Sequence, residues 1–177
     1  MKKAFLFLGL LTYFMGFSQD LDNLEFKKIT FENINIPKDF RVFEDKFEGS
    51  KSIFSYKSDG ANVKLNIAIA DGYAALKVYT FYNSASWLFI ESISFLCNDN
   101  VRKIIIAVKN KEIVNSSIQE RTYTILSKED LLFLSNILKE DNKIEVRLQG
   151  QSKVYDFKLS KKNIKAMIQT IELYNSL

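Results

Sequence analysis

The residue types that most often carry catalysis are scarce in this chain. Its 177 residues include no His and a single Cys, Cys97. Without His there is no imidazole to act as a general base, to activate a nucleophile or to ligate a metal ion. One Cys excludes an internal disulfide and every zinc or iron–sulfur site that needs several thiolates. The sequence therefore predicts no metal and no cofactor, and it favours a protein that is not an enzyme.

A nucleophile that works without His would need another partner. Cys97 is expected on the same strand face as Ile93 and Phe95, and a Cys among apolar residues is typical of the core. Neither S-x-x-K nor G-x-S-x-G occurs in the chain. We therefore expect Cys97 to be a buried apolar side chain.

Carboxylates are the remaining route to hydrolysis, because glycosidases use two acids that face each other across a cleft. The acids expected within sheet regions are Glu91, Glu145 and Asp156. On an alternating strand, Glu91 shares its face with large apolar residues between Trp87 and Phe95. Such a carboxylate is either partly buried, with a raised pKa or a basic partner, or placed at a bulge or edge that reaches water. A carboxylate-based hydrolase is therefore one alternative function.

Clustered aromatic residues supply candidate binding chemistry. Tyr79, Phe81, Tyr82 and Trp87 fall within nine positions, and alternation places Tyr79 and Phe81 on one strand face and Tyr82 on the other. Aromatic rings flanked by Asn and Ser are typical of glycan or peptide grooves, and also of ordinary cross-strand packing. The candidate ligand-binding residues are these four and Glu91, and a glycan- or lipid-binding module is a second alternative.

The chain begins with the pattern of a secretory signal peptide. Lys2 and Lys3 precede 14 uncharged residues, Ala4 to Phe17, and the small residues Gly16 and Ser18 favour cleavage before Gln19. The apolar run is short for a bilayer span, which needs about 20 residues. We expect residues 1–18 to be removed and residues 19–177 to form a single exported domain, with no membrane-integral part after cleavage.

The charge balance argues against a nucleic-acid partner. The predicted leader holds two of the 25 basic residues and none of the 21 acidic ones, so the mature chain carries a net charge of about +2. Its basic residues are interspersed with acidic ones, whereas nucleic-acid binders gather them in a dense stripe.

The elements that must position these residues are mostly strands. Alternation or β-branched content predicts strands over 29–36, 52–57, 63–70, 76–82, 87–97, 103–108, 120–126, 144–148 and 154–159. Asp71-Gly72 is a two-residue hairpin signal, and Asn98-Asp99-Asn100 is read as a turn. The continuous run Ile104-Ile105-Ile106 predicts a central strand that is buried on both faces.

The pattern changes to a helical period after residue 126. Ser127 and Asp130 have capping-box spacing, followed by apolar positions from Leu131 to Leu138 and an expected end near residues 140–142. Ser160 caps a second helix with apolar residues from Ile164 to Tyr174 on one stripe. The predicted fold class is α+β, a mostly antiparallel sheet or sheets with two C-terminal amphipathic helices. A β-sandwich with appended helices is the alternative.

The chain from Ser127 onward resembles the ends of small exported proteins of unassigned function in Bacteroidota. The strand 144–148, Gly150, the segment 155–160 and the closing helix carry the resemblance, and the leader is similar too. The resemblance implies an exported α+β domain in a Gram-negative envelope, periplasmic or secreted, and no catalytic residue. We expect a non-enzymatic interaction module, such as an inhibitor, immunity-like or accessory protein, with a protein or glycan partner.

Overall fold

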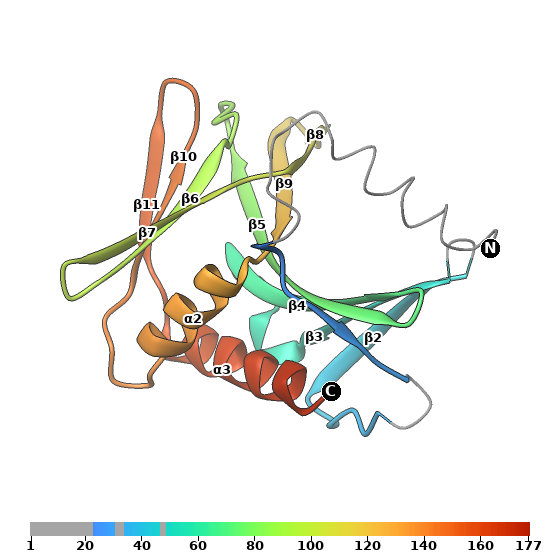
Figure 1. Cartoon of the computed structure of the whole chain (residues 1–177). Helices are drawn as coiled ribbons and strands as arrows, with labels where there is room; N and C mark the ends of the chain where they lie inside the picture. The colour runs from blue at the N-terminus through green and yellow to red at the C-terminus, as the bar shows by residue number, and fades with distance from the viewer. Residues whose placement is uncertain (1–22, 31–33, 47–48) are drawn as a thin grey trace.

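The computed structural model describes residues 23–30, 34–46 and 49–177, and the predicted signal peptide lies outside these residues. The fold is α+β, as predicted: within the described residues, two antiparallel sheets are accompanied by two helices, the second at the C-terminus (Figure 1). No helix among the described residues is long and apolar enough to cross a membrane.

The larger sheet has seven strands in the order β2-β3-β4-β5-β9-β8, and β1 pairs with the first residues of β5. Its strands are β1 (Phe26–Lys28), β2 (Phe40–Asp45), β3 (Ser50–Ser55), β4 (Val63–Ala70), β5 (Tyr73–Ser84), β8 (Val108–Val114) and β9 (Ser117–Ile125). The smaller sheet has the order β11-β10-β6-β7. Its strands are β6 (Ser92–Cys97), β7 (Asn100–Ile105), β10 (Glu145–Gln149) and β11 (Val154–Lys158).

The hairpin of β4 and β5 is the clearest success of the sequence pattern. Val63 pairs with Thr80 and Ala70 with Tyr73, so Asp71 and Gly72 form the two-residue turn. Both turn residues have positive φ, 51° and 78°, as primed hairpin turns require. The alternation of β4 buries every second residue, from Val63 to Ile69.

Helix α3 (Lys161–Ser176) covers one face of the larger sheet, where it contacts β3, β4, β5 and the short 3-10 helix η3 (Tyr56–Ser58). Its predicted stripe is buried at Ile164, Met167, Ile171 and Tyr174. Ser160 is the N-cap, as predicted, and its hydroxyl accepts the backbone N–H of Asn163. These side chains belong to one core cluster that includes the inner faces of both sheets.

At its other end, α3 is capped from β1. The Lys27 ammonium donates to the carbonyl oxygens of Tyr174 and Asn175, at 2.9 and 3.1 Å. A cation at this position satisfies free carbonyls and complements the helix dipole. The Tyr174 hydroxyl, in turn, donates to the Glu25 carbonyl. These contacts tie the first described strand to the last helix.

Helix α2 (Lys128–Ile137) starts as predicted and ends earlier. Ser127 and Asp130 form a complete capping box. The helix ends at Ile137, and the Asn142 side chain then donates to the carbonyl of Ile137. Leu134 is buried, whereas Leu132, which lies in the same predicted apolar stretch, is 64% exposed.

Several predicted strands were wrong in extent. The described part of 29–36 is not strand. β1 pairs with residues 73–75, the first residues of β5, and the next N–H, that of Ile29, bonds to Gly72 in the turn before β5. Strands β2 and β8 were not predicted. Of the stretch 87–97, only β6 is strand.

The central strand predicted at Ile104–Ile106 was also wrong. Ile104 and Ile105 are the last residues of β7, and Ile106 lies in the connection to β8, which starts at Val108. Strand β7 is an edge strand of the smaller sheet. Ile104 and Ile106 are buried, but Ile105 faces outward and is 53% exposed. The apolar run reflects the passage of one extended segment from one sheet to the other, where the chain bends at Ile106 and Ala107.

Candidate functional site

The structure separates the five predicted ligand-binding residues. Tyr79 and Phe81 lie on the face of β5 that points away from the core, whereas Tyr82 is buried on the other face, as the alternation predicted. Tyr82 makes an edge contact with Tyr155 of the smaller sheet, at a centroid distance of 5.4 Å. Tyr82 is therefore a core residue, and Tyr79 and Phe81 belong to a different surface.

Trp87 lies in the connection between β5 and β6, which forms a corner between the two sheets. It stacks on Phe89, with 5.7 Å between the ring centroids, and the Lys111 ammonium lies 4.5 Å from the centroid of Phe89. Lys111 is the cross-strand partner of Glu120, whose side chain points into the core. Cross-strand partners share a face, so Lys111 lies on the same side of the sheet as Glu120. The aromatic pair beside Lys111 is therefore separate from Tyr79 and Phe81, which lie on the other side.

Glu91 is exposed, so the expectation of a partly buried carboxylate at this position was wrong. Its residue follows the corner rather than lying in a regular strand, and only its backbone is engaged. The Glu91 N–H donates to the carbonyl of Gln149, and its own carbonyl accepts from Ile106. The alternative expectation was a bulge or an edge position; the side chain does reach water, but because residues 87–91 are not strand.

Glu120 on β9 is a fully buried carboxylate that the sequence pattern did not indicate. It has no exposed surface, and it accepts the backbone N–H groups of Leu88, Phe89 and Ile90 at 2.6, 2.8 and 3.0 Å. Phe89 has a φ of 58°, which lets consecutive N–H groups converge on one anion. The three donors use both carboxylate oxygens, so Glu120 is a structural group that closes the corner.

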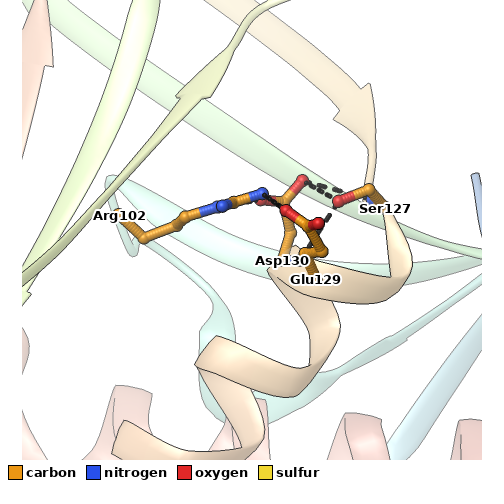
Figure 2. Close-up of polar contacts among 4 residues, drawn as sticks. All are labelled: Arg102, Ser127, Glu129 and Asp130. Carbon is orange, nitrogen blue, oxygen red and sulfur yellow. Dashed lines mark hydrogen bonds and ion pairs between the residues drawn. The ribbon is translucent and has the colours of Figure 1, made fainter. Parts of the chain in front are cut away.

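A second acidic cluster fixes helix α2 to the smaller sheet (Figure 2). The Arg102 guanidinium on β7 donates to Asp130 at 2.6 Å and to Glu129 at 3.1 Å. Asp130 also completes the capping box with Ser127, so its carboxylate has partners on two elements. The hydrogen bond to Asp130 raises the pKa of the Arg102 guanidinium above its ordinary value. Each of the three charged side chains in this cluster, Arg102, Glu129 and Asp130, has an oppositely charged partner.

The other two predicted acids, Glu145 and Asp156, do share a surface. Both line an open depression of about 360 Å³ on the outer face of the smaller sheet. Arg147 binds Asp156 through two hydrogen bonds of 2.7 and 2.6 Å, which hold the pKa of this carboxyl below its ordinary value. Glu145 pairs with Lys158 at 3.4 Å. A glycosidase acid needs a raised pKa, so this arrangement does not support acid catalysis.

Cys97 is buried beside Ile93 and Phe95, as predicted. Within residues 23–30, 34–46 and 49–177, no group of three or more Cys, Asp or Glu side chains is arranged to hold a metal ion. The turn at Asn98 and Asp99 has positive φ at both residues and connects β6 to β7 as a tight hairpin.

The remaining candidate is the open face, the side of the larger sheet opposite α3. Register places its residues in rows that run across the strands, with Lys64 beside Tyr79 and Tyr79 beside Tyr123. The open face includes Arg41, Phe54, Lys64, Asn66, Lys77, Tyr79, Phe81, Glu112, Arg121 and Tyr123. Among the described residues, neither helix and no strand of the smaller sheet packs on it (Figure 1).

Cations and aromatic rings alternate on the open face. The Lys64 ammonium lies 4.7 Å from the ring centroid of Phe54 and 4.9 Å from that of Tyr79. The Lys77 ammonium lies 4.7 Å from the centroid of Tyr123. Such contacts stabilise a cation by about 0.5–2 kcal/mol, depending on how far it is removed from water.

Lys64 and Lys77 differ from the other cations of this surface because they lack an anionic partner. Arg41 pairs with Asp59 and Arg121 with Glu112. No carboxylate among the described residues forms an ion pair with Lys64 or Lys77, although Asp59 acts on Lys64 from a longer distance. Burial lowers the pKa of both lysines, because desolvation disfavours their charged forms.

Comparison with protein-family models, with curated proteins and with solved structures found no match to this chain. The candidate site therefore depends on geometry alone. The sequence contained part of the signal: a two-residue turn at residues 71 and 72 pairs Lys64 with Tyr79 and Asn66 with Lys77. The contribution of β9 required the strand order, which alternation does not give.

Proposed function

We propose that this chain is an exported, non-enzymatic binding protein that holds its ligand on the open face of the larger sheet. The observation that carries the proposal is the pair Lys64 and Lys77, two half-buried cations set among aromatic rings and without an ion-pair partner among the carboxylates that the structure describes. A protein stabilises such cations poorly on its own, so their presence on an aromatic surface that no described helix covers favours a binding role.

The arrangement of the acids supports binding over hydrolysis. Asp156 and Glu145 are paired with basic residues on the smaller sheet. Glu120 is saturated by backbone donors, and Asp130 is held by Arg102 and Ser127. A glycosidase mechanism needs one carboxyl that gives up a proton and one that stays ionised across a substrate cleft, and none of these acids offers that combination.

Site-specific photocrosslinking in the producing cell tests the proposed function without knowing the ligand. A photoreactive benzoylphenylalanine at Phe81, on the open face, is expected to give an ultraviolet-dependent adduct. The matched control is the same group at Val101, which is 62% exposed on the smaller sheet. The proposal fails when neither position gives an adduct, or when only Val101 does.

Export is a separate part of the proposal and rests on residues 1–18. We infer that the mature protein begins at Gln19 and works in the periplasm or outside the cell, where its partner would be a component of the envelope. N-terminal mass spectrometry of protein from the producing cell tests this step. A first residue of Gln19, free or cyclised to pyroglutamate, is expected, and an intact Met1 in the membrane fraction contradicts it.

A further inference from the structure

We propose that the ligand of the open face is an acidic polysaccharide, whose carboxylates pair with Lys64 and Lys77 while its sugar rings lie on the neighbouring aromatic side chains. This inference rests on the proposed binding function and names the chemistry of the ligand.

The first argument is the position of the two lysines relative to each other. Lys64 is opposite Tyr79 and Lys77 is opposite Asn66, so the lysines are diagonal neighbours on adjacent strands. Diagonal neighbours lie about 7–8 Å apart at the backbone, within reach of long side chains. Their ammonium groups lie over different rings, that of Lys64 over Phe54 and Tyr79 and that of Lys77 over Tyr123, so the face presents two separate positive charges. A ligand with repeated negative charges would pair with both residues.

Asn66 provides a second, independent observation. Its side-chain oxygen is buried and has no hydrogen-bond partner, one of two such atoms among the described residues. The residue stands in the same row as Lys77. An unsatisfied buried acceptor costs about 1–3 kcal/mol. Two unpaired cations and a buried, unpaired acceptor are therefore adjacent, and a ligand that carries carboxylates would match the two cations.

The shape of the open face favours a polysaccharide over a membrane or a protein partner. Phe54, Tyr79, Phe81 and Tyr123 are half-buried in the pleated surface rather than projecting from it. Insertion into a bilayer needs protruding apolar side chains on an amphipathic element, and the central aromatic residues of this face do not protrude. A row of half-buried aromatic rings with polar groups between them suits a chain of sugar rings laid across the strands.

Binding of polygalacturonate to the purified full chain, measured by calorimetry, tests the inference. The matched ligand is polygalacturonate with its carboxyls methyl-esterified, which keeps the sugar backbone and removes the charge. We expect the acidic polymer to bind and the ester to bind at least about tenfold more weakly, since a charge-assisted hydrogen bond contributes this much or more.

Protein variants locate the binding. Lys64→Gln with Lys77→Gln should weaken binding of polygalacturonate by about tenfold or more, and Lys77→Arg should retain it. The control is Lys161→Gln with Lys162→Gln, two exposed lysines at the start of α3, which should change affinity less than about twofold. Thermal melting confirms that each variant is folded, and replacing a partly desolvated charge is not expected to unfold the sheet.

Four results would overturn the inference. Equal binding of the ester would show a ligand recognised without its charge. An equal loss of affinity in the Lys64/Lys77 and the Lys161/Lys162 double variants would show an unspecific attraction between a polyanion and a lysine-rich protein. Lysine-dependent binding to phosphatidylglycerol vesicles, without binding to polygalacturonate, would point to a membrane. Absence of binding to both polygalacturonate and alginate would rule out acidic polysaccharides as the ligand. Crosslinking at Phe81 would still test, separately, whether the open face binds a ligand at all.

Discussion

The carboxylate of Glu120 on β9 accepts a hydrogen bond of 2.8 Å from the backbone N–H of Phe89, a residue at a φ of 58° in the corner between the sheets. The neighbouring N–H groups of Leu88 and Ile90 bond to the same carboxylate. A corner residue has no adjacent strand to accept its N–H, so the side chain of Glu120 replaces the missing strand. The two sheets are joined by this contact and by the bend at Ile106.

Glu120→Gln is predicted to destabilise the protein strongly although it keeps the size of the side chain. The amide has one acceptor oxygen, and its NH₂ group would face a backbone donor. Because at least one buried N–H would lose its partner, the free energy of unfolding should fall by about 3 kcal/mol. Urea denaturation measures the change. The control is Glu112→Gln, whose exposed pair with Arg121 should contribute less than about 1 kcal/mol. Similar losses in the two variants would refute the corner assignment.

Gly150 is predicted to be intolerant of any side chain for a steric reason. A Cβ at this position would lie 1.7 Å from the carbonyl oxygen of Leu88, in the same corner. Since backbone must move to relieve that overlap, Gly150→Ala should cost at least about 3 kcal/mol. Gly60→Ala is the control, because Gly60 has space around it and a φ of +74°, so its cost of about 1 kcal/mol is conformational only. Melting temperatures that order the two variants the other way would contradict this reading.

The neighbouring residues Ile104 and Ile105 are predicted to respond in opposite ways to the same substitution. Ile104 is 3% exposed and Ile105 is 53% exposed, because successive residues of β7 point to opposite faces. Ile104→Asp would place an unpaired charge in the core and should cost on the order of 4 kcal/mol. Ile105→Asp should cost less than about 1 kcal/mol. Chemical denaturation of both variants checks the difference, and a large loss for Ile105→Asp would restore the buried central strand that the sequence predicted.

The same pair shows what alternation along a sequence can and cannot determine. It gave the inward and outward residues of β4 and β5, since a two-residue turn fixes the register of both strands. It failed at Ile104–Ile106, because a continuous apolar run is produced equally by burial on both faces and by an extended segment that changes sheet. The capping box of α2 was readable, since Ser127 and Asp130 interact within one turn.

The candidate site was partly predictable for the same reason. Tyr79 and Phe81 were placed on one strand face correctly, because alternation is a local property. Tyr123 reaches that surface only through pairing of β5 with β9, some 44 positions along the chain from Tyr79. Glu120 was not recognised as the buried acid, because its partners are backbone groups of residues 88–90, and the sequence carries no side-chain signal of such contacts.

Tyr174 is predicted to make the stability of the fold fall at alkaline pH. Burial raises the pKa of its hydroxyl from 10.0 to about 12, because the phenolate would be desolvated in the core between α3 and the larger sheet. Between these values the unfolded state has lost this proton and the native state has kept it. The unfolded state thus binds fewer protons, so the free energy of unfolding falls as pH rises. The contribution of Tyr174 is fully present below pH 10 and is lost as pH passes through about 12.

Tyr174→Phe isolates this effect, because the variant keeps the ring and removes the titrating group. At pH 9 it should be slightly less stable than the wild type, since the hydrogen bond from the Tyr174 hydroxyl to the Glu25 carbonyl is lost. Between pH 10 and 12 the wild type should lose about 2–3 kcal/mol relative to the variant. Leu173→Ala is the control: it removes a buried side chain from the same helix without a titrating group, so its destabilisation should be constant with pH. Urea unfolding of the three proteins at intervals from pH 9 to 12 makes the comparison. If the free energy of unfolding falls in parallel with pH in the wild type and in Tyr174→Phe, the hydroxyl ionises equally easily in the folded and unfolded states, and the prediction is wrong.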